Sequence, residues 1–289
     1  MTFALTPEQA HILVIINTVA TTLSLLGAGF MIWTYCSIPT IRTFSMKLVI
    51  SLIVTDTITG LTNLLAFYDQ NEFICSIEGF LRNASNLSSV IWVTIISWIS
   101  YKQICNYEPK VLGYYSRLLI LNISLCIIPA TIATVSTIFE LTPIRFGHNF
   151  GNCMIVPDIF NIWAFELPVW TMISMIFYFS CKIYSHLKGV MDDFAVIEYK
   201  SALIYPLILV VLWMPSLINR FLVDFFDIHI YAILLLHNGC LKLQGFANAI
   251  AYGKSEFSKI KSYFEKKSFT SSTIRSESLL GLNLVHFEE

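Results

Sequence analysis

Seven long apolar stretches constrain this chain more than any other feature of its sequence. They lie near residues 11–36, 44–68, 74–105, 115–139, 159–187, 200–223 and 228–252. A helix needs about 20 mostly apolar residues to cross roughly 30 Å of hydrocarbon, and each stretch is long enough. Short loops rich in prolines and charges separate most of them. The sequence therefore predicts an all-α membrane protein built as a bundle of seven transmembrane helices.

The composition excludes a soluble fold of this size. Hydrophobic residues make up 56% of the 289 positions and charged residues only 13%, whereas a soluble domain carries about a quarter charged residues. So much apolar surface cannot be hidden from water behind so few charges, and we expect the excess to face lipid.

The distribution of basic residues predicts the orientation. Fourteen of the 18 lie in or beside the loops at 37–43, 106–114 and 189–199 and in the C-terminal tail. They are Arg42, Lys47, Lys102, Lys110, Arg117, Lys182, Lys188, Lys200, Lys254, Lys259, Lys261, Lys266, Lys267 and Arg275. The opposite loops hold only Arg145. The positive-inside rule places the basic side in the cytosol. We therefore expect an extracellular N-terminus, a cytosolic C-terminus and a location in the plasma membrane.

The C-terminal region predicts a surface helix and a tail. In residues 254–264, Phe257, Ile260 and Phe264 share one helical face, which is typical of a short amphipathic eighth helix on the inner leaflet. We expect residues 1–264 to form the receptor domain, and 265–289 a disordered cytosolic tail. Candidate phosphorylation sites in the tail are Ser268, Thr270, Ser271, Ser272, Thr273, Ser276 and Ser278.

Several residues are chemically unusual for their positions. Asp56 lies mid-span, where a carboxylate is costly and is often functional, although neighbouring hydroxyl and amide groups can also satisfy it. Pro215 follows Trp213 by two residues within a span and predicts a kink or hinge. Cys75 and Cys153 are both expected on the oxidising side, where they are either paired or free thiols.

Together, the seven spans, short loops, surface helix and Ser/Thr-rich tail resemble a G-protein-coupled receptor. The resemblance implies a Cys75–Cys153 disulfide and makes Asp56 the helix-2 aspartate of a polar cavity that often binds sodium. It makes Trp213 and Pro215 the helix-6 switch, and the pair Asn248 and Tyr252 the helix-7 motif, here with Ala249 in place of its proline. The chain departs from the pattern in lacking an Asp-Arg-Tyr triplet after helix 3. Lys102 is the only cation near that position.

Within this superfamily the chain resembles the slime-mould cyclic-AMP receptors and their cyclic-AMP-receptor-like relatives. Residues 24–56, 75–93 and 243–253 carry this resemblance. It implies an extracellular ligand similar to cyclic AMP and activation of a heterotrimeric G protein through opening of helix 6. Lys102, Lys110 and Lys188 are the candidate G-protein contacts. Beyond these partners we expect only membrane lipids, and no nucleic acid.

A ligand pocket is expected to open outward between helices 3, 5, 6 and 7. The ionisable residues available to it are Glu78, Arg82, Glu166, Arg220 and Lys242. They either pair internally, for example Glu78 with Lys242 and Arg82 with Glu166, or some of the cations receive a phosphate or carboxylate ligand. Neither case needs a resident cofactor or a metal apart from a sodium ion near Asp56.

A second hypothesis uses the same residues. Opsins also place a carboxylate three residues after the helix-3 cysteine and a lysine six residues before the helix-7 asparagine, which are here Glu78 and Lys242. Lys242 would then hold retinal as a Schiff base and Glu78 would be the counterion. Other classes lack support, because the six histidines are scattered and no internal repeat indicates a transporter. We therefore expect no enzyme.

Overall fold

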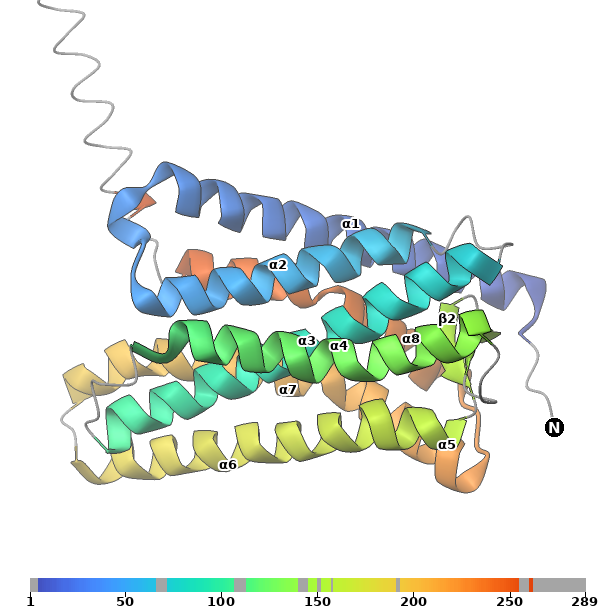
Figure 1. Ribbon diagram of the computed structural model, residues 1–289. Coiled ribbons are helices and arrows are strands. Elements are labelled where there is room, and N and C mark those ends of the chain that lie inside the picture. Colours follow the sequence, from blue (N-terminus) through green and yellow to red (C-terminus); the bar gives the residue numbers. More distant parts are fainter. Residues whose placement is uncertain are drawn as a thin grey trace, which may run out of the picture.

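A computed structural model of the chain describes most of the molecule. The described residues are 5–65, 72–106, 113–139, 145–149, 152–156, 158–190, 193–254 and 260–261. Seven helical rods lie side by side and run alternately up and down (Figure 1). The predicted seven-helix bundle is therefore confirmed.

The first four rods are the helices α1 (Pro7–Ser37), α2 (Phe44–Leu65), α3 (Glu72–Cys105) and α4 (Tyr115–Phe139). The fifth rod consists of α5 (Asp158–Asn161), a π-helical turn (Ile162–Glu166) and α6 (Leu167–Val190). The sixth is α7 (Asp193–Phe226). The seventh is α8 (Tyr231–Lys242) followed, after a turn at Leu243, by residues 244–254, which we name the final helix. The strands β1 (Arg145–Asn149) and β2 (Asn152–Val156) form an antiparallel hairpin between the fourth and fifth rods.

Five of the described helical segments are long and apolar enough to cross a membrane by themselves. They are Pro7–Ser37, Phe44–Leu64, Tyr115–Thr137, Ile162–Lys188 and Pro206–Val223. The central helix α3 packs against α2, α4, α6 and α7, so neighbouring protein shields many of its polar side chains from lipid. Large apolar side chains such as Leu26 and Ile120 lie exposed on the outside of the bundle. The chain is a multi-pass membrane protein whose outer surface suits lipid.

Local chemistry explains both ends of α1. At the start, the Gln9 backbone N–H donates to the Thr6 hydroxyl at 3.2 Å, and the Gln9 side chain accepts from the Thr6 N–H at 3.0 Å. This capping box satisfies two N–H groups that have no partner within the helix. At the end, the Arg42 guanidinium donates to the carbonyls of Tyr35 and Cys36, which are likewise unpaired in the helix.

The structure differs from the predicted boundaries in three places. Helix α7 begins at Asp193 instead of residue 200, because hydropathy marks only the part of a helix that lies in lipid. The loop predicted at 140–158 contains a hairpin. The seventh span is interrupted at Leu243, whose N–H donates to the carbonyls of Gly239 and Cys240. Of the predicted eighth helix only residues 260–261 are described, and they are helical. The tail at 265–289 lies outside the described residues.

Candidate functional site

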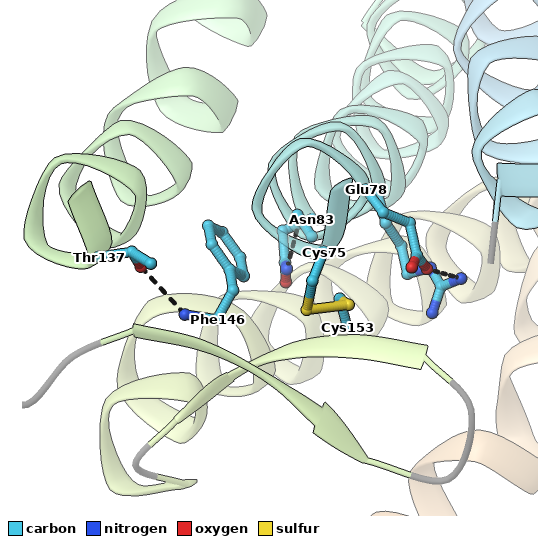
Figure 2. Close-up of a disulfide and its surroundings, with 8 residues drawn as sticks. Cys75, Glu78, Asn83, Thr137, Phe146 and Cys153 are labelled. Carbon is cyan, nitrogen blue, oxygen red and sulfur yellow. Dashed lines mark hydrogen bonds and ion pairs between the residues drawn. A yellow bond between two sulfur atoms is a disulfide. The ribbon is translucent and has the colours of Figure 1, made fainter. Parts of the chain in front are cut away.

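The hairpin lies at the end of the bundle where α1 begins (Figure 1). Cys153 of β2 forms a disulfide with Cys75 near the start of α3, with 5.3 Å between their Cα atoms. The ring of Phe146 fills the space that a side chain at Gly79 would need, and the Phe146 N–H donates to the Thr137 hydroxyl at 3.1 Å (Figure 2). The disulfide predicted by resemblance is confirmed, and the hairpin is tied to both α3 and α4.

Beneath the hairpin lies a cavity of about 170 Å³ lined by the second, third, fifth, sixth and seventh rods. Cys153 lines it, as do His229 and Ile230 from the connection between α7 and α8. Its wall includes six asparagines, Asn63, Asn83, Asn86, Asn161, Asn219 and Asn238. Aromatic residues Phe165, Trp170 and Trp213 also line the cavity. The lining thus combines carboxamide donors and acceptors with apolar rings, as in many small-molecule sites.

Four of the five predicted ligand-binding residues line this cavity, namely Arg82, Glu166, Arg220 and Lys242. Glu78 does not. Its side chain is fully buried behind Arg82 and forms an ion pair with it. The two residues are one turn apart on α3, where side chains four positions apart meet.

A second ion pair joins two parts of the cavity wall, the fifth rod and α7. Arg220 Nε of α7 lies 3.6 Å from Glu166 Oε1, which also accepts a hydrogen bond from Asn161 Nδ2 at 2.9 Å. Glu166 is the last residue of the π-helical turn, a type of distortion that is frequent at functional sites. The observed pairs, Glu78–Arg82 and Glu166–Arg220, differ from the pairs suggested in the sequence analysis.

Lys242 stands apart from these pairs. Within the part of the chain that the structure describes, its ammonium group makes no ion pair and no hydrogen bond. It lies close enough to Glu78 and Arg82 to interact with both electrostatically, but their charges offset each other. The two ion pairs are formally neutral, so a protonated Lys242 gives the lining a formal charge of +1.

Below the cavity, a hydrogen-bond network joins four rods. Trp213 Nε1 donates to Gln244 Oε1 at 3.0 Å. Gln244 Nε2 donates to Asp56 Oδ1 at 3.1 Å and to Ser89 Oγ at 2.6 Å. The Ser89 hydroxyl donates to Asp56 Oδ1 at 2.8 Å, and Asn248 Nδ2 donates to Asp56 Oδ2 at 3.0 Å. Three predicted switch residues thus meet in one place, together with Ser89 and Gln244.

The other predicted switch residues lie at separate positions. Tyr252 is fully buried on the final helix, and its hydroxyl accepts from Thr34 Oγ1 of α1 at 3.4 Å. Pro215 lies within α7, two residues beyond Trp213. The structure therefore connects Asn248 directly to Asp56, whereas Tyr252 connects the final helix to α1.

Sequence reasoning missed Gln244, Ser89 and His237. His237 contacts Ser216 Oγ and Asn219 Nδ2 of α7, each at 3.2 Å, and so links α8 to α7 beside the cavity. The one feature that could have identified these three residues is that each is polar within an apolar span. Many polar side chains in such spans, however, only form a hydrogen bond within their own helix, as the Thr57 hydroxyl does with the Ile53 carbonyl. Nothing in the sequence distinguishes the two cases.

At the opposite end of the bundle, Lys102 and Lys188 lie in the last turns of α3 and α6. The rings of Tyr101 and Phe179 stack between these two helices, with 5.5 Å between their centroids. Lys110 and the seven candidate phosphorylation sites lie outside the described residues. These positions stay predictions of a G-protein contact and a regulated tail.

Comparison with known proteins supports one class. No family model matches the chain. It is 26% identical over 276 residues to the "G-protein coupled receptor 1" of Arabidopsis thaliana, covering 86% of this chain and 80% of that protein. Its structure superposes on the crystal structure of squid rhodopsin with a TM-score of 0.65 and 15% identity, over 93% of this chain and 88% of rhodopsin. The fold is therefore the seven-helix fold of rhodopsin, and the sequence similarity supports a protein of the G-protein-coupled receptor kind.

Proposed function

We propose that this protein is a G-protein-coupled receptor of the plasma membrane that binds a small anionic ligand from outside the cell. The observation that carries the proposal is the Lys242 ammonium, which lines the cavity without an ion-pair partner among the described residues. A lysine near the middle of a membrane helix costs roughly 2.5–3.5 kcal/mol on insertion scales. A bound anion would offset more of this cost than a neutral acceptor would, because hydrogen bonds between opposite charges are stronger.

The rest of the lining specifies the ligand further. Arg82 and Arg220 are each held by a carboxylate, so one net positive charge favours a singly charged anion. The asparagine carboxamides donate and accept hydrogen bonds, and the aromatic rings favour a flat apolar portion. A cyclic nucleotide such as cyclic AMP meets these requirements, because its phosphodiester carries one negative charge beside a sugar and a base.

Two features support an extracellular cavity. The strand β2, which carries Cys153 of the Cys75–Cys153 disulfide, lies at the end of the bundle where α1 begins (Figure 1), and disulfides persist on the oxidising side of a membrane. Lys102 and Lys188 lie in the last turns of α3 and α6, at the opposite end of the bundle. The positive-inside rule assigns the end that carries basic residues to the cytosol. We infer that the N-terminus is extracellular and the C-terminus cytosolic.

The transmission of the signal would begin at Trp213. Its side chain lines the cavity and is hydrogen-bonded through Gln244 to Asp56, so a ligand that moves the indole also disturbs the buried network. Pro215 removes a backbone hydrogen bond from α7 and allows this helix to bend nearby. Movement of the cytosolic half of α7 would then open a cleft beside Lys102 and Lys188 for a heterotrimeric G protein, as a population shift favoured by the ligand.

A ligand screen in cells with a G-protein activation reporter tests the proposal. Cyclic AMP, other nucleotides and small organic anions are compared with uncharged analogues, at matched surface expression. For an active anion, Lys242→Gln should raise the half-maximal concentration about 10- to 150-fold, because a hydrogen bond to a charged group contributes about 1.5–3 kcal/mol.

The matched control is Arg117→Gln, which removes a cation that lies exposed outside the cavity. It should leave the potency unchanged. Equal potency of an anion on the wild type and on Lys242→Gln would refute an anion site at this lysine. So would an equal response to an anion and to its uncharged analogue.

The opsin-like alternative rests on the same amine. Lys242 lies in a cavity with Trp213 and Phe165, as a retinal-binding lysine would require. Its expected counterion, Glu78, is however enclosed behind Arg82 and paired with it. Purification with retinal followed by a visible spectrum separates the two functions. A band beyond the absorption of free retinal that Lys242→Gln removes would establish the photoreceptor, and its absence would dismiss it.

A further inference from the structure

We propose that the carboxamide of Gln244 takes the place of a cation at Asp56, so that the buried carboxylate of this receptor fold binds no sodium ion. The donors and acceptors around Asp56 support this inference, whatever the ligand and whether or not the protein couples to a G protein. Gln244 is a positioning residue in this account, because it acts by setting the surroundings of Asp56.

The orientation of the Gln244 carboxamide is fixed from both ends. An indole N–H can only donate, so the Gln244 atom 3.0 Å from Trp213 Nε1 must be the oxygen. The amide nitrogen then faces Asp56 Oδ1 at 3.1 Å and Ser89 Oγ at 2.6 Å. The opposite orientation would place two donors against each other at Trp213 and two acceptors against each other at Asp56.

Asp56 is well supplied with hydrogen-bond donors. Its Oδ1 accepts from Gln244 Nε2 and Ser89 Oγ, and its Oδ2 accepts from Asn248 Nδ2 at 3.0 Å. A hard cation binds through oxygen atoms, and an amide N–H pointing at the carboxylate cannot be a ligand. Both N–H groups of the Gln244 amide are used, and the Ser89 hydroxyl is turned toward Asp56 as a donor. Three protein donors thus already offset much of the charge on the carboxylate that a sodium ion would otherwise balance.

The remaining space next to Asp56 also disfavours a cation. A chamber of about 20 Å³ adjoins the carboxylate and is lined by Ser24, Asn63, Asn86 and Lys242 among others. This volume holds about one water molecule, so a sodium ion there would have to give up nearly all of its hydration shell. The Lys242 side chain lines both this chamber and the larger cavity, so it brings a positive charge to the space that a sodium ion would occupy. Like charges in such an enclosed site repel each other strongly.

Thermal unfolding of the purified full-length protein in sodium, potassium and choline chloride at equal ionic strength tests the inference. The wild type should unfold at the same temperature in all three salts. Gln244→Glu replaces the amide donor by carboxylate oxygen, which can still accept from Trp213. This variant should gain a saturable rise in unfolding temperature specific to sodium, because the ion then bridges two carboxylates. Gln244→Ala removes the competing donor and should gain a smaller rise.

Gln9→Glu is the matched control, because it makes the same chemical change at the exposed capping box of α1, where glutamate also serves. It should show no sodium-specific effect. A saturable, sodium-specific stabilisation of the wild type that Asp56→Asn abolishes would overturn the inference. It would also be overturned if Gln244→Ala folds and neither Gln244 variant responds to sodium. All these results are independent of whether the protein activates a G protein.

Discussion

Replacing Gly27 with alanine tests how closely α1 packs against the final helix. A Cβ atom at Gly27 would lie 2.9 Å from the Phe246 Cα, 3.0 Å from the Gly245 carbonyl oxygen and 3.0 Å from the Ala249 Cβ. Two of these neighbours are backbone atoms, so they cannot turn aside as the end of a flexible side chain would. The two helices must therefore separate to admit even one methyl group.

The magnitude follows from two opposing effects. Adding a methyl group to a close-packed contact costs typically 1–3 kcal/mol. Replacing glycine by alanine within a helix contributes about 1 kcal/mol in the opposite direction. Gly29 provides the control, because a Cβ there meets no atom within 4 Å and Gly29→Ala gains only the second effect. The two variants should therefore differ in stability by about 1–3 kcal/mol.

The assay is thermal unfolding of both variants and the wild type in one detergent, followed by the loss of monodisperse protein. A change of about 1 kcal/mol in the free energy of unfolding shifts the unfolding temperature of a domain of this order of size by roughly 2–4 °C. The Gly27→Ala variant should therefore unfold several degrees below the Gly29→Ala variant. Equal unfolding temperatures for the two alanine variants would show that α1 does not approach the final helix this closely.

Two further predictions concern links between helices. The Cys75–Cys153 bond closes a loop with a sequence separation of 78, so its removal should cost at most about 4–5 kcal/mol by loop-closure entropy. Cys75→Ser, Cys153→Ser and the double variant should lose the same stability in thermal unfolding, and a double variant with the sum of both losses would contradict a shared bond. Asn122 of α4 accepts from Ser88 Oγ at 2.6 Å and donates to the Ser88 carbonyl at 3.0 Å. Asn122→Leu should cost about 1–2 kcal/mol because it takes away the acceptor of the buried Ser88 hydroxyl and one of the two donors to the Ser88 carbonyl. Ser88→Ala should cost less in the Asn122→Leu background than alone, whereas additive losses would argue against the pair.

The fold could be predicted from the sequence because lipid imposes a simple rule. A backbone in hydrocarbon must satisfy its own hydrogen bonds, so each apolar stretch of sufficient length becomes a helix. The spans at 44–68 and 115–139 agree closely with α2 and α4 for this reason. The hairpin at 145–156 could not be predicted, because it lies outside the lipid and is held by Cys153 and Phe146, whose partners are distant in sequence.

The sequence could predict which charged residues belong to the candidate site, but not which of them pair. A charge in a span is costly, and this drew attention to Arg82, Glu166, Arg220 and Lys242, which all line the cavity. Their pairing depends on the rotation of each helix, which a single sequence does not specify. The π-helical turn that ends at Glu166 changes that rotation within the fifth rod, and no residue pattern indicates it.

Accessibility of tags at the two termini measures most directly whether the helices cross the membrane an odd number of times, on which the whole account depends. In intact cells, an antibody should reach a tag before residue 1 and should reach one after residue 289 only when the plasma membrane is permeabilised. Both tags accessible from the same face would contradict seven crossings. The extracellular position of the cavity and the cytosolic site for a G protein would then both be lost.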